Sequence, residues 1–257
     1  RRMGVDTIRG SIVADRSMKD ADLLGEGWCW DDDNPPLSPL TIGRNTQFVD
    51  RFIRQLVDDG VVLDVRISDG TLPDSAFHLC SRFHSIDQIL LRMMKQSDNF
   101  YAEAMFYQLA AHQGHRPARA KDAAAIVKRL ISKVGLGHRP YRIADGSGLS
   151  LYNYLSADLE VRLLRYAYRN STVYLHLLPS LPVAGSDGTL RNRMRGSFAA
   201  DNVKAKTGTL EGVSALAGYC TAANDHRLCF SIINQGVMHT SNARRFQDRV
   251  CNALCAP

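Results

Sequence analysis

The chain has 257 residues, of which 45% are hydrophobic and 23% are charged. This is close to the composition of an average globular protein, so it excludes disordered and collagen-like chains. No run approaches the roughly 18 apolar residues of a membrane span. The formal net charge of +6 comes from scattered basic residues. Because no basic helix with interleaved aromatic residues is present, a solvated surface explains the charge better than nucleic-acid binding.

Six cysteines are present, and none of them forms a Cys-x-x-Cys pair. A structural zinc site is therefore not expected. Cys251 and Cys255 are four residues apart on an expected helix, and Cys220 and Cys229 fall on expected neighbouring strands. We favour buried thiols, and disulfides remain the alternative in an oxidising compartment.

Local patterns predict mostly helices first and then strands. Apolar spacing and capping residues predict helices over 47–59, 85–95, 99–112, 119–134 and 156–169, with a short strand over 61–67 and a loop over 31–36. Three apolar, β-branched segments then predict strands over 203–206, 213–221 and 228–235, and the chain closes with a helix over 242–254. Ser85 and Ser156 are expected N-caps, and Asn224-Asp225 marks a hairpin turn. The order predicts an α/β fold in the broad sense, more narrowly α+β, with a helical cluster on an antiparallel sheet.

The tripeptide Ser97-Asp98-Asn99 lies at an expected junction between two helices. The Ser97 hydroxyl could relay a proton and the Asn99 carboxamide could bind a substrate amide, if both point into a cleft. Taken alone, the tripeptide is more simply explained as a helix N-cap.

The second motif, Lys206-Thr207-Gly208-Thr209, falls on an expected strand. A cation and hydroxyls on an edge strand suit a carboxylate ligand, and Gly208 would let a ligand approach the backbone closely. Taken alone, these residues are more simply an exposed strand end.

The pairing of Ser-Asp-Asn with a later Lys-Thr-Gly is that of serine β-lactamases and penicillin-binding proteins. The chain resembles the D-alanyl-D-alanine carboxypeptidase/endopeptidases among the class C low-molecular-mass penicillin-binding proteins, peptidase family S13. The resemblance rests on five segments that follow one another along the chain in the family's order: residues 10–15 with 25–32, then 94–99, 144–150, 181–190 and 203–210. It implies a β-lactamase/transpeptidase-like fold, with residues 1–257 forming one penicillin-binding domain.

The resemblance also implies the site and its chemistry. Ser97, Asn99 and Lys206 would act in catalysis. Thr207, Gly208, Thr209 and Ser147, the last from the turn Asp145-Gly146-Ser147-Gly148, would bind substrate. An acyl-enzyme would form and be hydrolysed, with no metal or other cofactor. The ligands would be peptidoglycan stem peptides and β-lactams, and the protein would be periplasmic or otherwise exported. The resemblance is also compatible with peripheral association with the cell envelope.

One element of the family is not found in the sequence. No serine is followed three residues later by lysine, and in Ser17-Met18-Lys19 the spacing is too short to place both side chains on one helical face. We therefore reject Ser17 as nucleophile and expect the first part of the catalytic domain, with Ser-x-x-Lys, to lie outside this sequence. The alternatives are a non-catalytic binding module, a serine β-lactamase and, least favoured, a nucleic-acid-binding domain. The sequence leaves the choice between carboxypeptidase and endopeptidase, and the oligomeric state, open.

Overall fold

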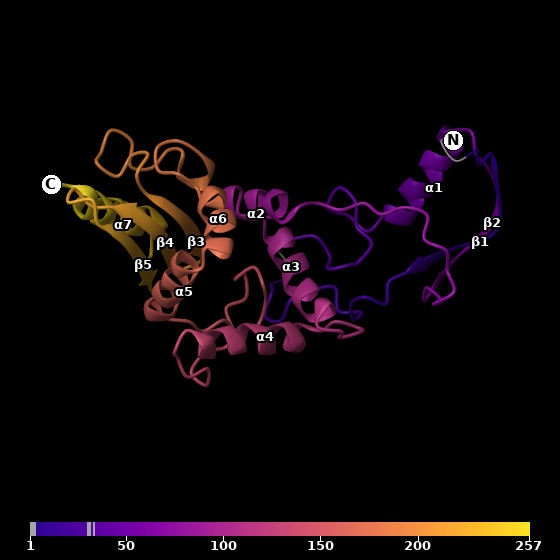
Figure 1. Ribbon diagram of the computed structural model, residues 1–257, viewed down its shortest axis with the longest axis horizontal. Helices are drawn as coiled ribbons and strands as arrows, with labels where there is room; N and C mark the ends of the chain where they lie inside the picture. Colours follow the sequence, from indigo (N-terminus) through magenta and orange to yellow (C-terminus); the bar gives the residue numbers. More distant parts are fainter. Residues whose placement is uncertain (1–3, 30–31, 33) are drawn as a thin grey trace.

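A computed structural model describes residues 4–29, 32 and 34–257. Trp30 of the family segment, Asp31 and Asp33 of the expected loop, and residues 1–3 lie outside the described part. The described chain is elongated (Figure 1). A sheet and its helices lie at the C-terminal end, further helices lie in the middle, and a small N-terminal unit lies at the far end.

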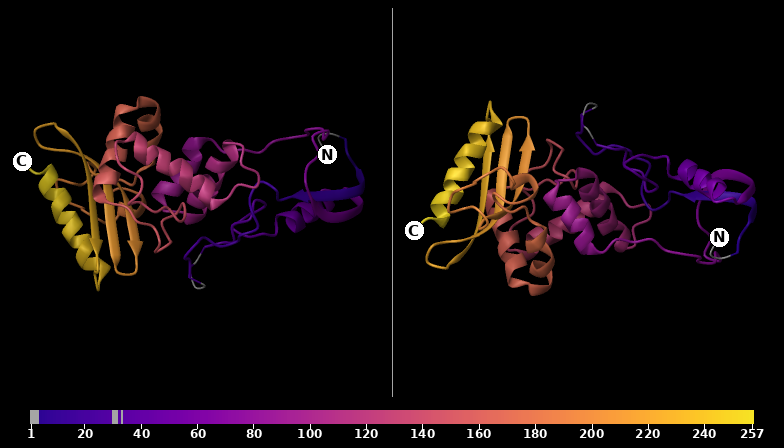
Figure 2. Two further views of the ribbon diagram at one scale, coloured as in Figure 1. Left: turned by 90° about the horizontal axis from the view of Figure 1, so that it is seen from below. Right: turned by 90° about the horizontal axis from the view of Figure 1, so that it is seen from above.

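The C-terminal sheet is antiparallel, in the order β3-β4-β5. Its strands are β3 (Lys204–Leu210), β4 (Val213–Thr221) and β5 (Arg227–Gln235). Helix α7 (Thr240–Cys255) covers one face, and α5 (Ala157–Arg169) lies on the other (Figure 2). Because both faces are covered, the central strand β4 is apolar along most of its length, and Leu216 is fully buried. The predicted α+β class is confirmed.

All six cysteines are free thiols. Cys251 and Cys255 share the buried face of α7, as expected, and both pack with Cys220 in the core between that helix and the sheet. Cys229 on the neighbouring strand is partly buried. The favoured prediction of buried thiols is confirmed for the three core cysteines.

The middle of the molecule is a helical cluster. It contains α2 (Ile86–Lys95), α3 (Asn99–His112), α4 (Ala120–Lys133) and α6 (Ser171–Ser180). Ser85 caps α2 in a reciprocal capping box and Ser156 caps α5, as predicted. Phe106, Tyr107 and Ala110 of α3 pack with small residues of α4 in a second core. Sequence patterns did not predict α6, whose apolar residues are distributed around the helix rather than along one stripe.

The N-terminal unit is a parallel strand pair joined by a helix. Strands β1 (Thr7–Asp15) and β2 (Val62–Gly70) pair with Thr7 opposite Val62, and α1 (Phe48–Asp58) forms the crossover. The expected strand over 61–67 is confirmed, whereas β1 was not predicted. No residue of α1 is buried. In the part of the chain that the structure describes, none of the helices combines the length and apolar character needed to cross a bilayer.

Candidate active site

A pocket of about 780 Å³ opens between the helical cluster and the sheet edge at β3. Its wall includes all seven residues that the sequence predicted for the site: Ser97, Asn99, Ser147, Lys206, Thr207, Gly208 and Thr209. The fold therefore brings together three segments that are separated by up to 109 positions in the chain. Ser17 does not line this pocket.

Lys206 connects the two sequence motifs. Its Nζ donates to Ser97 Oγ at 2.7 Å and to the carbonyl oxygen of Thr207 at 2.6 Å. Burial lowers the pKa of Lys206 to about 8, because a charged ammonium loses hydration inside the pocket. The lysine can therefore hold or release a proton near neutral pH, next to a hydroxyl that can pass it on.

Ser97 has an unusual backbone conformation, and the residue that follows it is held by two arginines. Its φ is +55°, in the left-handed region that serine rarely adopts. The Asp98 carboxylate is buried, and it accepts from Arg44 Nη1 and from Arg92 Nε, each at 2.9 Å. Burial alone would raise the pKa of Asp98, but the hydrogen bond from Arg92 and the charges of both arginines bring this pKa below its usual value. The two arginines thus fix Asp98, and the Ser97 hydroxyl contacts Lys206 rather than capping α3.

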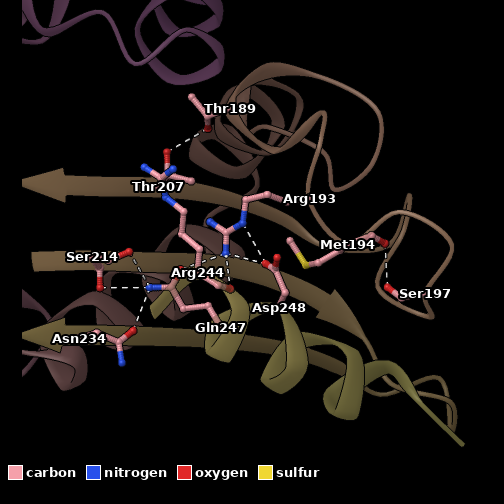
Figure 3. A network of polar contacts seen from close by, with 10 residues as sticks. All are labelled: Thr189, Arg193, Met194, Ser197, Thr207, Ser214, Asn234, Arg244, Gln247 and Asp248. Carbon is pink, nitrogen blue, oxygen red and sulfur yellow. Dashed lines mark hydrogen bonds and ion pairs between the residues drawn. The ribbon is translucent and has the colours of Figure 1, made fainter. Parts of the chain in front are cut away.

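A short 3-10 helix, η1 (Gly188–Leu190), brings an additional hydroxyl to the site. Thr207 Oγ1 donates to Thr189 Oγ1 at 2.9 Å (Figure 3). Lys95 Nζ holds this turn through Asp187 Oδ2 at 2.6 Å. At Gly188, where φ is +56°, an added Cβ would lie 2.8 Å from the Lys95 carbonyl oxygen. The sequence pointed to this segment only as part of the family resemblance and did not predict a contact with Thr207.

The turn that carries Ser147 is fixed by two buried carboxylates. Glu103 Oε1 accepts from the amides of Gly146 and Ser147 at 3.0 and 2.7 Å. Asp145 accepts from the amides of Gly148 and Ser150 at 2.9 and 2.6 Å. Burial raises the pKa of Glu103. Ser147 lines the pocket as expected, and its hydroxyl contacts Asp145 at 3.4 Å, so the loop is a fixed wall of the site.

Behind the sheet, α7 is joined to the strands by a buried polar network (Figure 3). Gln247, which is fully buried, donates from Nε2 to Ser214 Oγ at 3.1 Å and to Asn234 Oδ1 at 3.0 Å. One turn earlier on α7, Arg244 reaches the Thr209 hydroxyl at 3.4 Å. The strand that carries the second motif is thus supported from the side opposite Lys206.

Glu160 of α5 is a pocket residue that sequence reasoning missed. Its Oε2 accepts from Ser231 Oγ at 2.5 Å. Ser231 lies in the same row across the sheet as Lys206, because both residues pair with Ala217 of the central strand. Burial raises the pKa of Glu160. No local sequence signal distinguishes this glutamate from a surface residue in the first turn of a helix.

Comparison with solved structures identifies the class of protein. The crystal structure of penicillin binding protein 4 (dacB) from Haemophilus influenzae matches with a TM-score of 0.85 at 23% identity, over 100% of this chain and 77% of that chain. A second structure of that protein, complexed with a β-lactam, matches with a TM-score of 0.69 at 27% identity, over 82% of this chain and 51% of that chain. The chain therefore has the fold of penicillin-binding protein 4, which confirms the predicted fold.

The sequence defines the family. The model of the D-Ala-D-Ala carboxypeptidase 3 (S13) family matches residues 45–254, and the chain belongs to that family, as its motifs indicated. It is 34% identical over 189 residues to D-alanyl-D-alanine carboxypeptidase DacB of Haemophilus influenzae, covering 72% of this chain and 38% of the relative. It is 40% identical over 158 residues to D-alanyl-D-alanine carboxypeptidase of Actinomadura sp., covering 59% of this chain and 28% of the relative. The matched part thus spans well under half of either relative.

Proposed function

We propose that this chain forms the substrate-binding side of a serine-type D-alanyl-D-alanine carboxypeptidase/endopeptidase that acts on peptidoglycan stem peptides and binds penicillins. The observation that carries the proposal is the 2.7 Å contact between Lys206 Nζ and Ser97 Oγ in a pocket that Asn99 also lines. Family membership and the β-lactam in the complex of the Haemophilus influenzae protein support it.

In the proposed reaction, a serine of a Ser-x-x-Lys motif outside these 257 residues attacks the carbonyl carbon of the penultimate D-Ala. The peptide bond breaks, the terminal D-Ala leaves as an amine, and water later releases the acyl group. Ser97, hydrogen-bonded to Lys206, relays the proton to the leaving amine. Asn99 binds a substrate amide, and the ammonium of Lys206 attracts the terminal carboxylate.

The strand and turn residues would complete the binding site. The Thr207 and Thr209 hydroxyls would hold the terminal carboxylate, with Thr189 beside Thr207. The backbone amide of Thr209 would donate to the oxyanion, and Gly208 would allow the ligand to approach the strand. Ser147 would form the opposite wall. No step requires a metal ion or other cofactor.

We assign residues 1–257 to one penicillin-binding domain. We expect the protein to be exported, because peptidoglycan lies outside the cytoplasmic membrane. Attachment to the envelope would be peripheral, and no role for nucleic acid is proposed. Absent or salt-insensitive binding to DNA is the expected result of a direct test, since the family match and the pocket motifs point to a peptide ligand rather than to a nucleic acid.

Two other functions would give different experimental results. A non-catalytic module would bind D-Ala-D-Ala peptides or β-lactams without being acylated, even in its longest natural form. A serine β-lactamase would hydrolyse penicillin rapidly and leave a D-Ala-D-Ala peptide intact. The family match favours the carboxypeptidase over the β-lactamase, and the presence of a Ser-x-x-Lys serine separates the carboxypeptidase from the non-catalytic module.

The decisive experiment is labelling with a fluorescent penicillin, using this chain and the longest natural form of the protein. We expect covalent label only where a Ser-x-x-Lys serine is present, and no label on the 257-residue chain. Lys206→Met in the longer form should strongly reduce labelling, whereas Arg16→Met, at an exposed ion pair far from the pocket, should not change it. Absence of label on the longer form would overturn the enzymatic proposal and leave the binding module.

A further inference from the structure

A second pocket, of about 610 Å³, lies at the other end of α5. Residues of α5, α6, β3, β4 and β5 line it, and Figure 1 shows α5 and α6 next to the sheet. None of the residues of the two sequence motifs lines it. It is therefore distinct from the candidate active site.

The charges in this pocket are all of one sign. Arg165 and Arg169, one turn apart on α5, line it together with Lys204 of β3 and Arg227 of β5. No aspartate or glutamate occurs among the described residues of its lining. Among the described residues, none of these four cations forms an ion pair or a side-chain hydrogen bond. By contrast, Arg162 on the same helix pairs with Asp158 at 3.0 Å. Four unpaired cations around one cavity repel one another, and a bound anion would relieve that repulsion.

The same pocket has an aromatic wall. The rings of Tyr168 and Tyr174 meet edge to face with centroids 5.2 Å apart, and Tyr174 meets Tyr219 in the same way at 5.3 Å. The Tyr219 hydroxyl donates to the Leu164 carbonyl oxygen. In the described part of the chain, the hydroxyls of Tyr168 and Tyr174 have no hydrogen-bond partner, and Tyr168 is 47% exposed. An exposed ring beside guanidinium groups suits the apolar face of a sugar, with its charged substituents on the arginines.

We propose that this pocket binds a sugar or polyol that carries phosphate or carboxylate groups. Arg165, Arg169 and Arg227 would pair with the anionic groups, and Tyr168 would contact the ring. Binding of this ligand goes beyond the proposed peptidase function and does not depend on it.

The second pocket also lies close to the first. Lys204 and Lys206 are two residues apart on β3, so their side chains leave the same face of the sheet, about 7 Å apart along the strand. A multivalent anion near Lys204 would favour the protonated form of Lys206. Occupancy of the second pocket should therefore raise the pKa of Lys206.

The test is calorimetric titration of the 257-residue chain at low ionic strength with glucose 6-phosphate, inorganic pyrophosphate and glucose. We expect glucose 6-phosphate to bind and glucose not to bind. Arg165→Gln and Arg227→Gln should each weaken binding about tenfold, the size of one charge-assisted contact. Arg162→Gln is the matched control on the same helix and should leave binding unchanged. Tyr168→Ala should weaken binding of glucose 6-phosphate but not of pyrophosphate.

Thermal unfolding of each variant checks that the fold is retained, and these arginine positions are exposed enough to tolerate the change. The proposal is overturned if glucose 6-phosphate does not bind, or if Arg162→Gln weakens binding as much as Arg165→Gln. It is also overturned if the chain sediments with phosphatidylglycerol vesicles but does not bind the soluble sugar phosphate, because the ligand is then a membrane surface. Penicillin labelling of the longer form is a separate readout, and its failure would leave this result unaffected.

Discussion

The Asp98→Asn substitution tests whether the two arginines hold the first motif in place. The Asp98 side chain is only 4% exposed, while those of Arg44 and Arg92 are 42% and 44% exposed. A hydrogen bond to a charged group contributes about 1.5–3 kcal/mol, and partial exposure of both arginines places each contact at the lower end. Asparagine keeps the size of the side chain and can still accept from one arginine. We therefore expect the free energy of unfolding to fall by about 2 kcal/mol at pH 7, which corresponds to a melting temperature roughly 4–8 °C lower.

The effect should also depend on pH with a defined sign. The pKa of Asp98 is lower in the folded than in the unfolded chain. Its ionised form therefore stabilises the fold above the unfolded value of about 3.9, and this contribution is lost as the pH falls through the lower folded value. The difference between the parent chain and Asp98→Asn should be constant from pH 7 to about pH 5 and should shrink below pH 4.

The measurement is urea or thermal unfolding of both proteins across this pH range. Asp69→Asn is the matched control, because it removes a carboxylate at 3.1 Å from an arginine on the exposed N-terminal unit, where Asp69 is 71% exposed. An exposed pair of this kind contributes at most about 1 kcal/mol. If Asp98→Asn costs no more than Asp69→Asn, or if its cost is unchanged at pH 3.5, the reasoning about the buried carboxylate is wrong.

Further predictions concern other parts of the site. Burial lowers the pKa of Lys206 to about 8, so the charged form of Lys206 opposes folding at neutral pH. The free energy of unfolding should therefore increase as the pH rises from about 8 to 10.5, where the folded chain has lost this proton and the unfolded chain still holds it. Lys206→Met should not show this increase. Binding of a carboxylate ligand in the pocket should weaken over the same rise, as measured by calorimetry at pH 7 and pH 9. Gly188→Ala should lower the free energy of unfolding in urea by about 1–3 kcal/mol, because a residue with left-handed backbone gains a Cβ close to the Lys95 carbonyl oxygen. Gly196→Ala should lower it less, because Gly196 has a similar φ of +65° but open space around the added Cβ. Gln247→Leu should lower the free energy of unfolding by about 2 kcal/mol, because it leaves the buried Ser214 hydroxyl and the partly buried Asn234 amide oxygen without a donor. Full retention of the melting temperature would contradict this account.

Local sequence signals predicted most of the helices and the three C-terminal strands, because apolar spacing, N-caps and turn residues act over a few neighbours. Ser85 and Ser156 cap the helices that they were expected to cap. Strand β1 escaped prediction because, in the described part of the chain, it pairs only with β2, more than fifty residues away across a helix. Helix α6 escaped because it is short, carries β-branched residues and Pro179, and follows α5 after Asn170 alone, so no local signal marks it as a separate helix.

The order of its motifs by itself indicated the family of this chain and the seven residues that we predict for the site, all of which line one pocket, since motif chemistry is a property of neighbouring residues. Tertiary structure alone decided how those residues act. Lys206 meets Ser97 across 109 positions, and Arg44 reaches Asp98 across 54. A pKa depends on burial and on nearby charges, which are contributed by distant parts of the chain, so no local pattern reports it. The same holds for the cationic pocket at the end of α5, whose arginines are ordinary surface residues until the fold gathers them around one cavity.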